Sequence, residues 1–317
     1  RARSACGGSR STCNVWHRPL PLAMSDLLDR PVLVGGTGRS GSTIVGHLLD
    51  HHPDLTLTRP LEVRFITGND GLADALTIAQ RKPGSAKAMS AARLAADRIL
   101  HRWYRRTPDV GLHTSISREE IGDLCDHYLG NFDADPLSAT RNLTRAVMAR
   151  IATKIDATRW VDTTPANARK AQRVEPIYPE STVIVVHRDG RDVAASFVHQ
   201  SFGPDDVFEA LAQWGQRMLR IHQAVQESRV GRVLEIDLVD LVDRDRLGTV
   251  ERICAAVGVE VDTSMVAWFE ENVTSAGAHQ GRWRRDFDAD SCARIDEDYL
   301  SICERLLAEG VRIPPAG

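Results

Sequence analysis

The sequence predicts an α/β fold, in which helices cover both faces of a central parallel sheet and a helical insertion occupies about residues 70–155. Short apolar runs alternate with helical patterns, which is typical of a three-layer α/β/α domain. The strongest run is TVIVV at residues 182–186, and a strand this apolar is buried on both faces at the centre of a parallel sheet. Glycines or cations directly follow two of the strands, at the edge where such sheets bind ligands.

The first expected element is a strand, loop and helix over residues 30–53. Residues 31–34 are apolar, residues 35–43 read GGTGRSGST, and apolar side chains then recur at helical spacing until Pro53 ends the helix. A glycine loop between a strand and a helix points backbone N–H groups at a phosphate, as in P-loop-like folds. The alternative is a tight turn without a ligand, but the cation and hydroxyls among the glycines argue against it.

The loop departs from the ATP-binding Walker pattern at one position. Gly36 and Gly41 have the G-x-x-x-x-G spacing, but Ser42 stands where the pattern has lysine. That lysine contacts the β- and γ-phosphates of ATP. Because Arg39 is the only cation in the loop, the sequence favours a 5′-phosphate chain that ends differently from ATP.

Helical patterns dominate the insertion, which is expected to cap the site. Residues 54–67 before it are expected to be irregular. Ser117 and Glu120 form a capping box at the start of one helix. The expected helices of the insertion span residues 71–80, 88–103, 117–128 and 138–155.

Strands and helices alternate over the rest of the chain. Strands are expected at residues 159–162, 182–186 and 232–236. The expected helices are a basic one at 166–174, one after residue 190, a long one at 207–225, one at 247–257 stopped by Gly258, and a last one at 292–306.

Composition limits the class of protein. The 317 residues carry a net charge of −3 and six scattered cysteines, so neither a nucleic-acid-binding surface nor a zinc site or disulfide framework is expected. No apolar run is long enough to span a membrane, and we expect a cytoplasmic protein without an integral membrane segment. We expect one domain over residues 30–317 and a disordered extension over residues 1–29. A transit peptide, or residues upstream of a true start at Met24, are alternatives for the extension.

A second cluster of chemistry follows the TVIVV strand. Arg188 stands at the end of this strand, and Ser196 lies eight residues later on the next helix. An arginine and a hydroxyl in these positions can hold one phosphate together, the arginine through two hydrogen bonds. The alternative is a solvated cluster of charges at a helix start, made with Asp189, Arg191 and Asp192.

Both clusters resemble the sulfotransferases that use 3′-phosphoadenosine 5′-phosphosulfate (PAPS). The 5′-phosphosulfate loop of that family matches residues 39–43, and its 3′-phosphate motif matches Arg188, Asp192 and Ser196. A late glycine-rich, basic segment of the family is similar to residues 277–284. The resemblance covers about residues 31–285 and looks closest to the bacterial and tyrosylprotein branches. It implies that the nucleotide is bound by Gly38, Arg39, Ser40, Gly41, Ser42, Thr43, Arg188, Ser196, Gly281, Arg282, Trp283 and Arg284.

The resemblance also implies catalytic roles for Glu62 and Arg39. Glu62 would take the proton of an acceptor hydroxyl as it attacks sulfur in line, and Arg39 would stabilise the charge that grows on the leaving 5′-phosphate. The scheme needs no metal. The alternatives are a surface ion pair for Glu62, and His113 as the base.

Two departures from the family keep other interpretations open. Thr163 stands where many relatives have a lysine, and residues 235–238 lack a tyrosine that relatives often carry. A phosphate-loop kinase or NTPase, and a catalytically weak nucleotide-binding relative, are the alternatives. The implied partner is a hydroxyl of a small molecule, glycolipid, carbohydrate or tyrosine, and a homodimer is compatible with the sequence.

Overall fold

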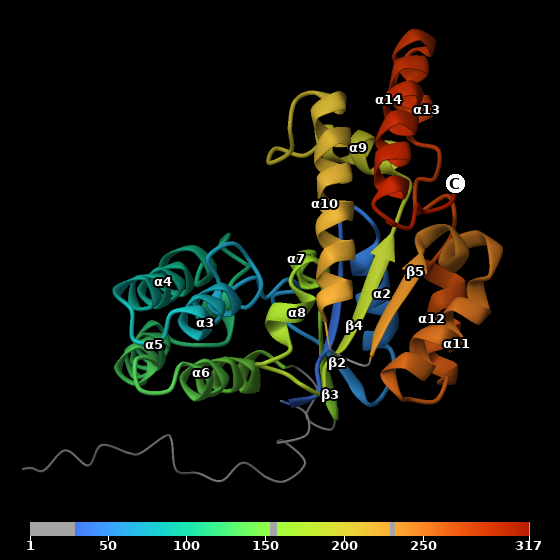
Figure 1. The fold of residues 1–317 in the computed structure, drawn as a ribbon. Coiled ribbons are helices and arrows are strands. Elements are labelled where there is room, and N and C mark those ends of the chain that lie inside the picture. Colours follow the sequence, from blue (N-terminus) through green and yellow to red (C-terminus); the bar gives the residue numbers. More distant parts are fainter. Residues whose placement is uncertain (1–28, 153–156, 229–231, 317) are drawn as a thin grey trace, which may run out of the picture.

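A computed structural model describes residues 29–152, 157–228 and 232–316 of the chain. Its centre is a five-stranded sheet with the order β2-β3-β1-β4-β5, and every pair of neighbouring strands is parallel (Figure 1). This confirms the predicted α/β class. The strands are β1 (Val32–Gly36), β2 (Leu55–Leu57), β3 (Arg159–Asp162), β4 (Thr182–His187) and β5 (Val233–Asp237).

Alternate residues of the central strands face different helices, and this alternation builds the three layers. Val32 and Val34 of β1 pack with α2, α11 and α12, whereas Leu33 packs with α7, α8 and α10 on the other face. Both sets are fully buried, as the apolar composition of the strands predicts. These helices are α2 (Ser42–Asp50), α7 (Ala166–Arg169), α8 (Ala171–Val174), α10 (Val207–Glu227), α11 (Arg246–Val257) and α12 (Thr263–Asn272).

Four helices between β2 and β3 pack together beside the sheet (Figure 1). Ser117 caps the third of them by accepting a hydrogen bond from the backbone N–H of Glu120, as the capping box predicts. The segment Arg98–Trp103, expected to continue a regular helix, forms a π-helical turn instead. The four helices are α3 (Leu72–Arg81), α4 (Ala86–Asp97), α5 (Arg118–Phe132) and α6 (Pro136–Ile151).

A further apolar core lies where three helices of the C-terminal half meet. Trp214 of α10 packs against Tyr299, with 5.4 Å between the ring centroids. This core fixes the helix after β4 and therefore the residues at its start. The additional helices are α9 (Gly190–Val198), α13 (Trp283–Asp286) and α14 (Ala289–Ala308).

Several local features of the structure differ from those predicted from the sequence. Strand β2 lies in a segment expected to be irregular, because three residues are too few for a periodic signal and pairing with β3 creates the strand. Helix α12 was not predicted, and the expected basic helix 166–174 is broken at Lys170. The prediction of a disordered extension falls almost wholly on residues 1–28, outside the described part of the chain.

Within the described ranges, no helix combines the length and apolarity needed to cross a membrane.

The contact between β1 and α7 leaves no space for a side chain at Gly35. A Cβ atom there would overlap the backbone nitrogen of Ala168, which α7 holds in place. By contrast, a Cβ atom at Gly122 of α5 would meet no atom within 4 Å. The same substitution at these two glycines therefore has opposite consequences.

We expect Gly35→Ala to lower the free energy of unfolding by about 1–3 kcal/mol, because the backbone of α7 must shift. Gly122→Ala should raise it by about 0.5–1 kcal/mol, because alanine is the better helix former. Urea denaturation of both variants measures the difference. Equal effects at the two sites would contradict the described contact between β1 and α7.

Candidate active site

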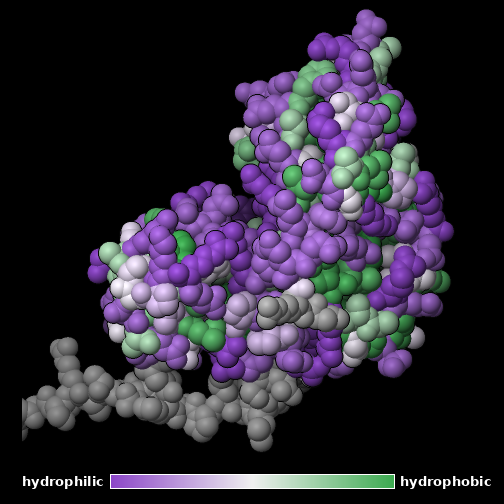
Figure 2. Space-filling model, in the orientation of Figure 1, coloured by the Kyte–Doolittle hydropathy of each residue, from purple (hydrophilic) through white to green (hydrophobic). Residues whose placement is uncertain are grey.

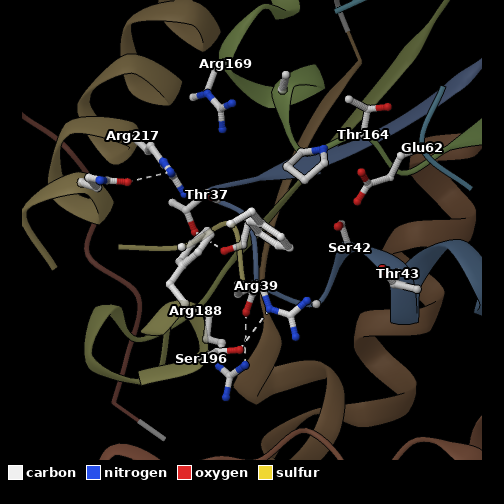
Figure 3. A pocket seen from close by; sticks show the side chains of 18 of the residues that line it. Thr37, Arg39, Ser42, Thr43, Glu62, Thr164, Arg169, Arg188, Ser196 and Arg217 are labelled. Atoms are coloured by element: carbon white, nitrogen blue, oxygen red, sulfur yellow. Dashed lines mark hydrogen bonds between the residues drawn. The ribbon is translucent and has the colours of Figure 1, made fainter. Parts of the chain in front are cut away.

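A cavity of about 1000 Å³ opens beyond the carboxyl ends of the central strands (Figure 3). It is lined by the loops that follow β1, β3 and β4, together with residues of α10, the π-helical turn and residues 277–282. Ligands bind at this edge in parallel α/β sheets. The structure therefore brings together the segments that the sequence analysis singled out.

The loop after β1 owes its shape to three residues with left-handed backbone conformation. Gly38, Arg39 and Gly41 have φ angles of 85°, 57° and 101°. Such a conformation strains a non-glycine residue, and strain of this kind concentrates at functional sites. Gly41 precedes α2, and no side chain caps that helix terminus. Among the N–H groups at the start of α2, those of Ile44 and Val45 donate to the carbonyl of Gly41, and those of Ser42 and Thr43 are placed to meet a ligand.

The two phosphate motifs of the sequence meet in space. The side-chain Nε of Arg39 donates to Ser196 Oγ at 3.0 Å, and Nη1 of Arg188 donates to the carbonyl of Arg39 at 3.1 Å. The dashed lines in Figure 3 mark this network. All three residues line the cavity, although the motifs are about 150 positions apart in the sequence.

Residues 277–284 are held over this network from the start of α9. Nη2 of Arg188 donates to the carbonyls of Ala278 and His279, at 3.0 and 2.9 Å. Asp192 accepts from the backbone N–H groups of Gly281 and Trp283, at 3.0 and 3.3 Å. The junction of β4 and α9 therefore supports both the glycine loop and the late segment.

Two buried polar atoms here have no partner among the described residues: Nε of Arg188 and Oγ of Ser40. Burial lowers the pKa of Arg188, and Asp192 offsets part of this effect from 3.6 Å. Buried polar groups are normally satisfied. Arg188 lines the cavity, so a phosphate there would supply an acceptor to its Nε, and the residues present fit a phosphorylated ligand in this respect; Ser40 is fully buried and is not among the lining residues.

The late segment contributes only part of its predicted residues to the cavity wall. Arg282 lines the cavity, and Gly281 makes the turn before it with φ 64°. Trp283 is buried, and the guanidinium groups of Arg191 and Arg284 lie 4.7 and 4.4 Å from its ring centroid. Trp283 and Arg284 are not among the residues that line the cavity.

Glu62 lines the cavity and points toward the start of α2, where Ser42 lies (Figure 3). Arg64 donates to its carboxylate at 2.5 Å, which is the ion pair that the sequence offered as the alternative. Asp162 accepts from the N–H of Val63 at 2.9 Å and from Thr164 Oγ1 at 2.9 Å. Burial raises the pKa of Asp162 to about 6, and its hydrogen bonds to Val63, Asn167 and Thr164 oppose this shift. Asp162 thus ties the Glu62 loop to the end of β3.

Two other predicted positions point away from the cavity. Thr163 is buried, donates to the carbonyl of Leu61 at 2.8 Å and packs against Gly46. His113 lies with its ring nitrogens 3.0 and 2.9 Å from the carbonyls of Tyr104 and Pro108, and is not among the lining residues.

Four arginines of the cavity wall were not predicted as site residues from the sequence. One is Arg169, which follows β3, and another is Arg217 of α10. One charged residue on an amphipathic helix gives no functional signal in the sequence, because such helices carry charges on their exposed face. The other two are Arg64 and Arg102.

Comparison with known proteins identifies similar chains. The sequence profile of the Sulfotransferase family matches residues 31–263. The sulfotransferase domain of the olefin synthase from Synechococcus PCC 7002 has a TM-score of 0.52 at 17% identity, over 89% of this chain and 96% of that domain. The sulfotransferase domain from the curacin biosynthetic pathway has a TM-score of 0.49 at 13% identity, over 91% of this chain and 100% of that domain. The sulfotransferase STF9 from Mycobacterium avium has a TM-score of 0.46 at 13% identity, over 92% of this chain and 79% of that chain. No curated protein sequence matches the chain.

Asp192→Asn replaces one acceptor oxygen by an NH₂ group, so at most one of the hydrogen bonds from Gly281 and Trp283 can remain, and the negative charge that strengthens both is lost. Hydrogen bonds to a charged group contribute about 1.5–3 kcal/mol each. We therefore expect amide hydrogen exchange at these two residues to accelerate by roughly 10–100-fold. Mass spectrometry of the exchange, with the exposed Asp298→Asn of α14 as a control, measures it. Unchanged exchange would mean that Asp192 does not hold the segment.

Proposed function

The chain belongs to the sulfotransferase family, and we propose that it transfers the sulfuryl group of PAPS to a hydroxyl of an acceptor. The observation that carries this proposal is the hydrogen-bonded junction of Arg39, Ser196 and Arg188. It joins a loop suited to a 5′-phosphate chain to a second cation and hydroxyl suited to another phosphate. A nucleotide with phosphates at both its 5′ and 3′ positions uses both halves of the junction, whereas ADP leaves the second half empty.

Within this proposal, the glycine loop from Gly38 to Thr43 binds the 5′-phosphosulfate, and Arg188 with Ser196 binds the 3′-phosphate. The partnerless Nε of Arg188, a residue of the cavity wall, supplies a donor for a phosphate oxygen. Residues 281–284 cover the nucleotide: Arg282 reaches it from the cavity wall, while Trp283 and Arg284 hold the segment in place through their ring contact.

The chemical step is an in-line displacement at sulfur. The acceptor oxygen forms a bond to sulfur while the bond between sulfur and the bridging oxygen of the 5′-phosphate breaks, and the electron pair stays on that oxygen. Arg39 and the loop N–H groups stabilise this charge, and donors in such positions are worth roughly 3–4 kcal/mol each. Glu62 takes the acceptor proton. The products are a sulfate ester and 3′,5′-adenosine bisphosphate (PAP).

Glu62 is the proposed base because one contact fixes its backbone and another orients its carboxylate. Asp162 holds the N–H of the next residue, and Arg64 orients the carboxylate. Residues 35–43 resemble the loop of the tyrosylprotein branch, and Glu62 resembles its base. Tyrosine is therefore one acceptor to test, beside carbohydrates, glycolipids and small phenols.

Arg188→Ala should weaken PAP binding by about 2–3 kcal/mol, or roughly 30–160-fold, because a charge-assisted contact to the 3′-phosphate is lost. Affinity for 5′-AMP, which lacks this phosphate, should change much less. Isothermal titration calorimetry measures both ligands, with the exposed Arg93→Ala as the control. Equal losses for PAP and 5′-AMP would remove the assignment of Arg188 to the 3′-phosphate.

Glu62→Gln should lower kcat for sulfuryl transfer by about 100-fold or more, because the base is lost, and leave PAP affinity nearly unchanged. The assay follows release of PAP from PAPS with a panel of hydroxyl acceptors, by chromatography. The exposed Glu304→Gln of α14 is the matched control. Full turnover in Glu62→Gln would place the base elsewhere, and no turnover in the unaltered protein on any acceptor would count against the proposed reaction.

A further inference from the structure

The cavity contains a second group of cations beside the proposed nucleotide site, centred on Arg169 and Arg217. We propose that this pair binds an anionic group of the acceptor, so that the acceptor is a hydroxyl compound that also carries a phosphate, sulfate or carboxylate group. The inference rests on the proposed function and adds the chemical class of the acceptor to it.

The charge of the cavity wall is the first observation. Its described residues include seven arginines and only two carboxylates, Glu62 and Glu209, and one of these is already paired with an arginine. Hydrophilic side chains gather where the helical group α3–α6 approaches α10 (Figure 2). A wall of one sign selects ligands of the opposite sign. The arginines are Arg39, Arg64, Arg102, Arg169, Arg188, Arg217 and Arg282.

Arg217 is held rigidly with its guanidinium at the cavity wall. Its Nη1 donates to the carbonyl of Thr37 at 2.8 Å and its Nη2 to Gln213 Oε1 at 3.0 Å. The group lies 4.6 Å from the centroid of the Phe197 ring. Arg169 approaches the same loop from the end of α7, and its Nη1 donates to the carbonyl of Gly36 at 3.3 Å. All of these partners are neutral.

Several other half-buried or buried cations of the described chain are paired with carboxylates, although the buried Arg159 donates only to carbonyl oxygens and to Thr182. Lys170 and Arg173 both contact Asp74, and Arg191 contacts Asp189. Burial and the neighbouring Arg217 lower the pKa of Arg169 to about 10, and burial also lowers that of Arg217. Both remain cations at neutral pH. Two partly buried like charges without a counter-charge are unfavourable, and an anionic ligand would relieve this.

The pair adjoins the proposed nucleotide site at the start of the glycine loop, where Nη1 of Arg217 lies near Gly38. Arg169 and Arg217 contact the first residues of the glycine loop, Gly36 and Thr37, whereas Arg188 contacts Arg39 beyond them. Figure 3 shows the two groups on opposite sides of Thr37. Glu62 lines the same cavity. An acceptor whose hydroxyl meets Glu62 can therefore extend its charged end toward Arg169 and Arg217.

A different assignment would give the pair to the nucleotide itself, in place of the lysine that Thr163 replaces. The binding experiment separates the two. The protein saturated with PAP is titrated calorimetrically with phenyl phosphate, phenyl sulfate and benzoate, each compared with neutral phenol. We expect at least one anion to bind ten-fold or more tightly than phenol, and the ranking of the three identifies the preferred group.

Arg169→Gln and Arg217→Gln should each reduce this preference at least five-fold, while Arg169→Lys retains part of it and the exposed Arg93→Gln retains all of it. PAP affinity should stay within two-fold in every variant. The melting temperature of the glutamine variants should be unchanged or higher, because repulsion is removed. A merely structural pair would instead lower it.

Two results would overturn the inference: no preference for any anion over phenol in the unaltered protein, or a preference that survives in both glutamine variants. Loss of PAP affinity in these variants with the anion preference intact would assign the pair to the nucleotide. Failure of the unaltered protein to bind PAP at all would count against the proposed function instead, and the anion titration without PAP would still report on the pair.

Discussion

The site depends on one guanidinium group, that of Arg188, at the end of the central strand β4. It donates to the carbonyl of Arg39 in the glycine loop and to those of Ala278 and His279 in the late segment. Because β4 is buried on both faces and α9 is fixed by its own apolar core, this side chain starts from a rigid position. Arg188 thereby fixes the positions of two segments that are far apart in the sequence, the glycine loop and residues 277–284. Its Nε has no partner among the described residues and is left for a ligand.

The second constraint is electrostatic. A chain with a net charge of −3 concentrates arginines in one cavity and leaves several of them on neutral carbonyl partners. Such an arrangement costs stability in the empty protein and favours anions inside it. Sulfuryl transfer from a nucleotide with several phosphates to an anionic acceptor fits that balance, since the ligands supply the missing negative charge.

The sequence predicted the parts of this protein that depend on short-range patterns. The GGTGRSGST loop, the apolar strand β4 and the Arg188 to Ser196 spacing are local features, and each encodes its geometry within about ten residues. Strand β2 and the positions of Arg169 and Arg217 depend on pairing between distant segments, which leaves no periodic trace in a single sequence. The same holds for Asp162, whose role in fixing the Glu62 loop follows from contacts across about 100 positions. Which charges of an amphipathic helix face a cavity becomes visible only once its neighbours are placed.

The central claim is that the cavity holds a nucleotide phosphorylated at both its 5′ and 3′ positions. Calorimetric titration of the protein with PAP, ADP and 5′-AMP, without magnesium, tests it most directly. The account predicts that PAP binds at least ten-fold more tightly than either of the others, because only PAP engages Arg188 and Ser196 together with the glycine loop. Equal or tighter binding of ADP, strengthened by added magnesium, would contradict the account and favour a phosphate-loop kinase or NTPase.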